Sequence, residues 1–310
     1  MAEQRDSGWV VAGEFALVTL IWGSTWLVIK TQLGVVPADW SVAYRFAAAA
    51  VLLAGFTAAT GRWRRLPARG HGFAVVVGLA NFSLNYNLVY AAEAQLTSGL
   101  VALVFALLVV PNAVLAAIFL KAPITRRFAA GAALGITGLA LVFAPDLAAP
   151  AAGGTAHGVV LVIVAVLAAS VGNVLQASPA GRGLPPLPLL TWGMAYGAAC
   201  NTLYALATAG SPVWDPRPAY GVGLAVLALA GTVVAFAAYF DLIRRIGPGP
   251  AGYVNVAVPI IALILSTLFE GYRWKPLAAT GAAVALAGLV VALAGRRVAA
   301  ARRETPSSVG

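Results

Sequence analysis

The chain has 310 residues, of which 61% are hydrophobic and 10% are charged. Soluble domains are about 45–50% apolar and about 25% charged, so this composition excludes a soluble globular protein and indicates an integral membrane protein. The formal net charge is +10, but most arginines fall in short loops between apolar runs, where membrane topology explains them better than a nucleic acid partner. The single cysteine, Cys200, excludes an internal disulfide bond and a thiolate metal site.

Apolar runs long enough to cross a bilayer as helices recur along most of the chain. Short polar breaks, or breaks rich in Gly and Pro, separate these runs. We therefore predict an all-α integral membrane protein with ten transmembrane helices. The predicted spans are 10–30, 39–60, 72–93, 96–120, 125–145, 156–178, 187–209, 218–245, 250–269 and 275–295.

The positive charges predict the orientation of these helices. Ten crossings place both termini on one side, and the loops on that side carry 15 Lys and Arg residues against four on the other. Because cytoplasmic loops are enriched in Lys and Arg, both termini are predicted to be cytoplasmic. The four residues on the opposite side are Lys30, Arg217, Arg273 and Lys275.

The two halves of the chain repeat one pattern. "PNAVLAAIFLKAPITRRFAAGAALGITGLALVF" and "PIIALILSTLFEGYRWKPLAATGAAVALAGLVVAL" share a proline in an apolar helix, a short charged loop and a last helix rich in small residues. Alanine-rich and glycine-rich membrane helices that look alike by chance are the alternative. The offsets hardly vary: 148 between Pro111 and Pro259, 149 between Tyr90 and Tyr239, and 150 from Gly131 and Gly138 to Gly281 and Gly288.

The repeat also predicts the architecture. Each half holds five predicted helices, an odd number, so the second half enters the bilayer from the side opposite to the first. We therefore predict two inverted five-helix repeats, over residues 10–145 and 156–295. Inverted repeats with a binding site near the bilayer midplane are a recurring design of secondary transporters.

These residues carry a resemblance to a known family. "LIWGSTWLVIK", a proline-containing turn, "AYRFAAAA", and then a mid-helix proline and a glycine-rich last helix in each half resemble the EamA-type branch of the drug/metabolite transporter superfamily. The resemblance covers essentially the whole chain. It implies a multi-pass transporter of the bacterial inner membrane, and members of the superfamily often export amino acids. Within it, the sequence is most similar to the aromatic amino-acid exporters.

The first helix contains "WGSTW", a cluster of aromatic and hydroxyl side chains inside the apolar run. Trp22, Thr25 and Trp26 share one helix face, and Gly23 beside them allows close approach of a neighbouring helix. Trp22 lies too deep for the interfacial aromatic belt. We expect Trp22, with Ser24 and Thr25, to line a central cavity, and packing against another helix is the alternative for both tryptophans.

The third helix holds the densest polar cluster, "ANFSLNYNLVYAAEAQ". Its amides cannot face lipid, because an unpaired amide in hydrocarbon costs several kcal/mol. Hydrogen bonds between helices explain one or two of them, and the number favours a hydrated cavity. The residues concerned are Asn81, Ser83, Asn85, Tyr86, Asn87 and Tyr90.

Two prolines lie within predicted helices. Pro111 and Pro259 each remove one helical hydrogen bond, so the carbonyl groups of Leu107 and Asn255 are expected to be free. We predict that the two prolines form paired hinges, and a static kink is the alternative. The remaining candidate substrate contacts are Asn112, Asn173, Tyr239, Tyr253 and Asn255.

Charged residues inside the predicted helices are few. Arg45 is expected close enough to the start of its helix to extend to the interface. No carboxylate is expected at the midplane, which favours facilitated transport or exchange over proton coupling. The acidic residues near predicted helix ends are Glu14, Glu93, Asp241 and Glu270.

The candidate functions fall into three classes: an enzyme, a channel and a secondary transporter. An intramembrane enzyme is disfavoured because His71 and His157 fall at helix starts and no deep carboxylate pair occurs. A channel is disfavoured because no charged ring or repeated filter loop is found. A secondary transporter that exports aromatic or other large neutral amino acids by alternating access explains most features, and an efflux carrier for drugs or amphipathic metabolites is the alternative. The predicted partners are a small-molecule substrate and the lipid bilayer, with a monomer as the working unit and no cofactor or metal.

Overall fold

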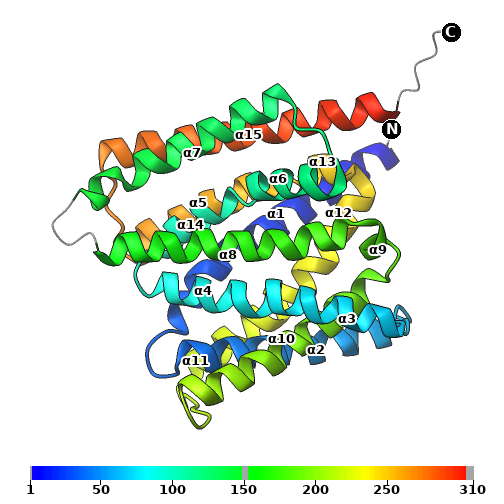
Figure 1. The fold of residues 1–310 in the computed structure, drawn as a ribbon, viewed down its shortest axis with the longest axis vertical. Helices are drawn as coiled ribbons and strands as arrows, with labels where there is room; N and C mark the ends of the chain where they lie inside the picture. Colours follow the sequence, from blue (N-terminus) through cyan, green and yellow to red (C-terminus); the bar gives the residue numbers. More distant parts are fainter. Residues whose placement is uncertain (1, 149–152, 305–310) are drawn as a thin grey trace.

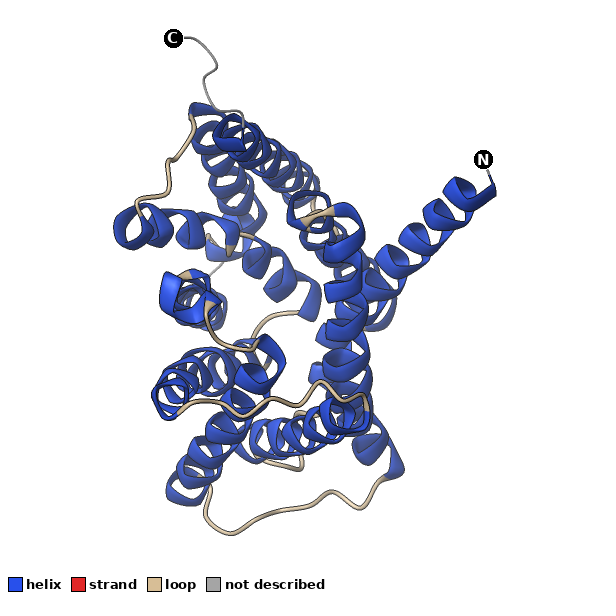
Figure 2. Cartoon of the chain, turned by 90° about the vertical axis from the view of Figure 1, so that its right-hand side faces the viewer, coloured by secondary structure: helices blue, strands red, loops and turns tan. Residues whose placement is uncertain are grey.

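The computed structural model describes residues 2–148 and 153–304, and within them every regular element is a helix (Figure 2). Eight helical stretches are long and apolar enough to cross a membrane, and Val254–Phe269 is a shorter apolar helix. The eight are Gly8–Thr31, Ala38–Ala59, Ala68–Glu93, Ser98–Leu120, Arg126–Leu147, Gly153–Ala177, Pro218–Ile246 and Pro276–Ala294. Pro186–Thr208 is a further long helix at the place of the seventh predicted span.

The ten predicted spans correspond to fifteen α-helices and two π-helical segments. The middle of the third span and the middle of the eighth are π-helical, where uninterrupted helices were expected. The elements are α1 (Ala2–Thr31), α2 (Ala38–Ala59), α3 (Ala68–Val77), η1 (Gly78–Leu84), α4 (Asn85–Glu93), α5 (Ser98–Ala106), α6 (Val109–Leu120), α7 (Arg126–Leu147), α8 (Gly153–Ala177), α9 (Pro179–Arg182), α10 (Pro186–Thr208), α11 (Pro218–Ala225), η2 (Val226–Val234), α12 (Ala235–Ile246), α13 (Pro248–Ala251), α14 (Val254–Phe269) and α15 (Pro276–Glu304).

The helices are stacked roughly side by side (Figure 1). α7 and α15 lie together at one end of the stack, and α2 and α10 lie together at the other. The start of α1 and the end of α15 lie on the same side, as an even number of crossings requires. Helices that occupy equivalent places in the two halves pack on each other, namely α2 on α10, α5 on α14 and α7 on α15.

The pair α7 and α15 shows how the halves are related. A Cβ atom on Gly131 would lie 2.6 Å from the Gly288 oxygen, and one on Gly138 would lie 2.5 Å from the Gly281 oxygen. Conversely, Cβ atoms on Gly281 and Gly288 would lie 2.6 Å from the oxygens of Gly138 and Gly131. The helices therefore run antiparallel, with backbones in contact, and each half presents the same surface to the other.

The two π-helical segments recur at equivalent places. η1 spans Gly78–Leu84 and η2 spans Val226–Val234, so their starts and ends are separated by the offset of the sequence repeat. A π-helical segment inserts extra residues into a helix and is frequent at functional sites. Hydrophobic periodicity does not reveal it, which is why two uninterrupted helices were predicted.

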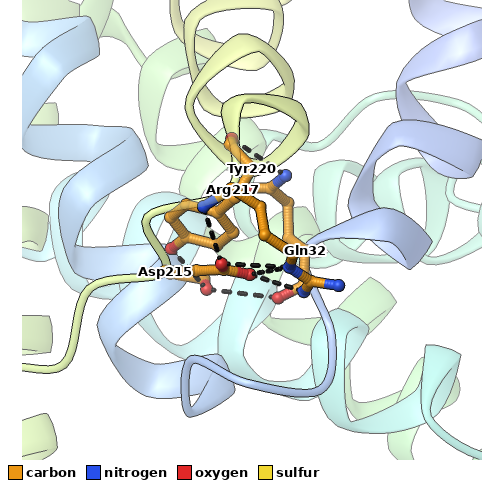
Figure 3. A network of polar contacts seen from close by, with 5 residues as sticks. Gln32, Asp215, Arg217 and Tyr220 are labelled. Carbon is orange, nitrogen blue, oxygen red and sulfur yellow. Dashed lines mark hydrogen bonds and ion pairs between the residues drawn. The ribbon is translucent and has the colours of Figure 1, made fainter.

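A polar network closes the end of the molecule where α1, α2 and α11 meet (Figure 3). Gln32 donates a hydrogen bond to the Tyr220 carbonyl at 3.4 Å, and the hydroxyls of Ser41 and Tyr220 lie 2.9 Å apart. In the preceding loop, Arg217 donates its Nε hydrogen to both carboxylate oxygens of Asp215, at 3.0 and 2.8 Å. These hydrogen bonds hold the pKa of the Asp215 carboxyl below its usual value of 3.8.

The glycine contact gives a first prediction. Gly138→Ala should lower the free energy of unfolding by about 1–3 kcal/mol, because the new methyl group meets backbone atoms that cannot move aside. Gly55→Ala is the matched control, because Gly55 lies inside α2 with no atom within 4 Å of its Cβ position. Thermal unfolding of the detergent-purified proteins measures the difference. An equal change in both variants would contradict this account of the helix contact.

The Asp215 ion pair gives a second prediction. Because the pKa of Asp215 is lower in the folded protein than in the unfolded chain, its contribution to stability is complete above the unfolded value of 3.8. That contribution is lost as the pH falls through the lower folded value. We expect the melting temperature of the wild type to fall more steeply below about pH 4 than that of Asp215→Asn. Parallel pH profiles would show that this carboxylate contributes nothing to acid stability.

Candidate functional site

The polar cluster predicted on the third helix lies inside the protein, facing α8 and α10. Asn81 donates a hydrogen bond to the side-chain oxygen of Asn173 on α8 at 3.3 Å, and Asn85 donates to the main-chain oxygen of Asn81 at 3.2 Å. Gly172 on α8 provides the space for Asn81, because a Cβ atom there would lie 2.3 Å from the amide oxygen. The side-chain oxygens of Asn81 and Asn85 are buried, and neither has a hydrogen-bond partner among the described residues.

A second amide pair supports the π-helical segment. Asn201 on α10 is fully buried. It donates to the main-chain oxygen of Phe82, within η1, at 2.9 Å and accepts a hydrogen bond from Asn87 at 2.9 Å. Asn201 therefore satisfies backbone that the irregular helix leaves exposed, which is a structural role. Asn87 belongs to this pair, and the side-chain oxygens of Asn81, Asn85 and Asn87 are all buried without a hydrogen-bond partner among the described residues.

Trp22 packs against the second half of the protein. Its indole Nε1 donates a hydrogen bond to the Gly231 oxygen in η2 at 3.1 Å. Its ring centroid lies 5.5 Å from that of Phe236 and 5.0 Å from that of Tyr239. The expected close approach at Gly23 is also present, because a Cβ atom there would lie 2.6 Å from Ile261. Trp22 therefore packs in an aromatic cluster that joins α1 to α12, which is the alternative of packing against another helix.

The other polar residues of the first helix bond to their own backbone. Ser24 donates to the Ile21 oxygen at 2.9 Å and Thr25 to the Trp22 oxygen at 2.7 Å. Trp26 packs on Phe105 of α5, with ring centroids 5.4 Å apart. The cluster "WGSTW" thus connects α1 to both halves, through Trp26 to the first and through Trp22 to the second.

The prolines occupy different helical positions. Pro111 lies in the first turn of α6, after a break in the helix at Leu107 and Leu108. The expectation of a free Leu107 carbonyl is wrong, because this oxygen accepts a hydrogen bond from the Val110 nitrogen at 2.8 Å. A tighter turn has replaced the helical bond that the proline would have removed. Pro259 lies inside α14, as expected.

The remaining predicted contacts flank these breaks. Asn112 follows Pro111, and its side-chain oxygen is buried without a hydrogen-bond partner among the described residues. Tyr253 packs in the apolar cluster that joins α6, α7 and α15. Asn255 donates to the Gly252 oxygen at 3.1 Å, so its amide is used within the turn before α14.

Two ionisable side chains lie deeper in the protein than the sequence indicated. Arg45 is 3% exposed and does not extend to the interface as expected. Its guanidinium lies 4.6 Å from the ring centroid of Tyr86 and 5.4 Å from that of Phe46, so aromatic rings have replaced the expected contact with water. Glu93, at the end of α4, is fully buried.

Two further charged residues hold the turn between α4 and α5. The Lys30 ammonium donates to the main-chain oxygens of Glu93 and, at 2.9 Å, of Leu96. The Glu270 carboxylate accepts the backbone N–H of Ser98, at 3.1 and 3.0 Å from its two oxygens, and also the Ser98 hydroxyl. Sequence reasoning placed these residues at helix ends but could not identify their partners.

The described residues contain no group of three or more His, Cys, Asp or Glu side chains that could hold a metal ion. The groups gathered around α1, α2, η1 and α4 are amides, aromatic rings and a few buried charges.

Comparisons with known proteins agree with this fold. The chain is 29% identical over 284 residues to the "Uncharacterized inner membrane transporter YedA" of Escherichia coli (strain K12), covering 88% of each protein. It is 28% identical over 125 residues to "Protein PagO" of Salmonella typhimurium, covering 40% of this chain and 41% of that protein. One crystal structure superposes with a TM-score of 0.66 at 18% identity, covering 93% of this chain and 98% of that chain, which shows a shared fold. The pattern of the EamA-like transporter family matches residues 11–144 and again residues 156–294. The chain therefore belongs to the EamA-like transporter family.

Proposed function

We propose that this transporter exports aromatic and other large neutral amino acids across the bacterial inner membrane by alternating access. The supporting observation is the pair of buried amide oxygens, on Asn81 and Asn85, that have no hydrogen-bond partner among the described residues. A buried polar atom without a partner is costly in a membrane protein. A substrate that donates hydrogen bonds removes that cost when it binds.

The aromatic residues suit a large apolar side chain on such a substrate. Trp22 and Tyr239 form one aromatic wall, and Trp26 with Phe105 forms another. Large apolar side chains bind well to such surfaces. We propose that Trp22 contacts the side chain of the substrate in the conformation in which α1 separates from α12, with Ser24 and Thr25 beside it. The other proposed contacts are Tyr86, Tyr90, Asn112, Asn173, Tyr253 and Asn255.

The orientation belongs to the same proposal. Export requires a site that opens first to the cytoplasm, and the excess of Lys and Arg in the loops beside the termini supports placing that side in the cytoplasm. Transport assays in oriented membrane vesicles report this direction.

The substrate proposal is tested with two variants. Trp22→Ala should weaken transport of phenylalanine more than that of threonine, because the lost aromatic surface matters only to a substrate that fills it. Asn85→Leu should weaken transport of both by roughly tenfold, since a shared polar contact is lost. Initial rates in proteoliposomes give the comparison, with Trp9→Ala as the control because Trp9 is 76% exposed.

An unchanged substrate pattern in Trp22→Ala and Asn85→Leu would contradict the proposed site. Transport of cationic dyes, with no transport of amino acids by the wild type, would favour the efflux alternative. Trp22→Phe keeps a ring beside Phe236 and Tyr239 and removes the indole N–H donor to the Gly231 oxygen, so it tests whether that hydrogen bond matters for transport.

The hinge proposal has its own test. We propose that Pro111 and Pro259 act as paired hinges in α6 and α14. Pro259→Ala restores a helical hydrogen bond inside α14, so it should slow transport several-fold while leaving the melting temperature equal or higher. Pro111→Ala lies in a first turn, where proline is tolerated, and should have the smaller effect. Wild-type rates in both variants and in the double variant would show that the kinks are static.

A further inference from the structure

Arg45 lies among aromatic rings with part of its hydrogen-bonding capacity unused. It projects from α2, is 3% exposed, and its guanidinium lies 4.6 Å from the centroid of the Tyr86 ring. Its Nε and Nη1 atoms are buried and have no hydrogen-bond partner among the described residues. The guanidinium has N–H donors and no acceptor, so its unused donors suit an anion such as a carboxylate. Nε and Nη1 therefore keep donor hydrogens that an anion can accept.

Glu93 is a buried side chain with the charge opposite to that of Arg45, and it also has unused hydrogen-bonding capacity. It is fully buried, and both carboxylate oxygens lack a hydrogen-bond partner among the described residues. Its charged neighbours are Lys30, Arg45 and Glu270. Lys30 donates to the main-chain oxygen of Glu93, and Glu270 accepts from Ser98, so both are already used in holding the turn. The carboxylate of Glu93 therefore has no hydrogen-bond donor among the described residues.

The two groups lie on facing surfaces. Tyr86, Tyr90 and Glu93 recur at the spacing that places them on one face of α4. Arg45 interacts with all three of them. Yet the unused donors of Arg45 do not reach the unused acceptors of Glu93. If the pair served only to stabilise the fold, direct hydrogen bonds would be expected, because charges left buried without them are costly. A ligand with an anionic and a cationic group can pair with Arg45 and with Glu93.

We propose that Arg45 and Glu93 form a subsite for a zwitterionic amino acid, in which the guanidinium binds the α-carboxylate and Glu93 binds the α-ammonium group. The inference rests on the proposed function and adds the residues that recognise the backbone of the substrate. The guanidinium lies over the ring of Tyr86, with its carbon 4.6 Å from the ring centroid. Glu93 lies about two turns further along the chain than Asn85 in the third predicted span.

The subsite also explains a preference between substrate classes. A ligand with only a cationic group leaves the donors of Arg45 unpaired, and it brings a positive charge toward Arg45 and Lys30. A ligand with only an anionic group leaves Glu93 unpaired beside a second negative charge. A zwitterion avoids both costs, so this site selects amino acids against cationic drugs.

The test uses three ligands and two variants of the full-length purified protein. The ligands are L-phenylalanine, L-phenylalanine amide, which lacks the carboxylate, and 3-phenylpropionate, which lacks the ammonium group. Arg45→Gln should weaken binding of phenylalanine by roughly tenfold to a hundredfold, the effect of losing a charge-assisted hydrogen bond at a buried site, and should not weaken binding of the amide. Glu93→Gln should weaken phenylalanine similarly and should not weaken binding of 3-phenylpropionate. Titration calorimetry gives the dissociation constants.

The controls separate the possible failures. Asp39→Asn changes a charge on the same helix as Arg45 and should bind all three ligands as the wild type does. Binding of phenylalanine by both variants with wild-type affinity would overturn the subsite but leave the proposed function intact. No binding of phenylalanine by the wild type would overturn the proposed function itself.

A further measurement needs only the wild-type protein. If either variant fails to give a monodisperse protein, the wild type alone decides the question. It should bind phenylalanine at least tenfold more tightly than either analogue, since each analogue leaves one buried charge unpaired. Equal affinities for the three ligands would overturn the proposal.

Discussion

The turn between α4 and α5 shows the constraint on which the rest of this structure depends. A helix end leaves carbonyl or N–H groups without partners, and a protein in a bilayer has to supply those partners itself. Lys30 meets the carbonyl groups at the end of α4, and Glu270 meets the N–H group at the start of α5. Each charge has the sign that complements the helix dipole at that end. Because α4 and α5 belong to the first half and Glu270 to the second, the contact of Glu270 with Ser98 also joins the halves.

This arrangement leaves several polar side chains of η1 and α4 without a role in capping the backbone. Lys30 engages the main chain of Glu93, so the side chain of that residue is not consumed by the cap. At the middle of the helix, Asn201 satisfies the irregular backbone of η1, so the neighbouring amides are not needed for that purpose. Structural residues from other helices thus meet the requirements of the backbone, and polar side chains of η1 and α4 keep unused hydrogen-bonding capacity.

The sequence predicted the framework well because the bilayer itself limits it. The length of an apolar run has to match the membrane, so span 39–60 closely matches Ala38–Ala59 and span 125–145 closely matches Arg126–Leu147. The partners of individual groups were not predictable, because they depend on which helices meet. Arg45 was expected at the interface and instead lies among aromatic rings. The Leu107 carbonyl was expected to be free, and a local change of helical pitch provides it with a donor.

The contact between α7 and α15 has a consequence for the origin of the chain. Gly131 meets Gly288 and Gly138 meets Gly281, and these four glycines are equivalents in the sequence repeat. A surface that meets a second copy of itself in this way is isologous, which is the form of contact found in a two-fold symmetric homodimer. A single five-helix chain carrying this surface already contains both sides of the interface. Gene fusion would then only have to join two antiparallel subunits, each inserted in the opposite direction, and no new interface would have to evolve.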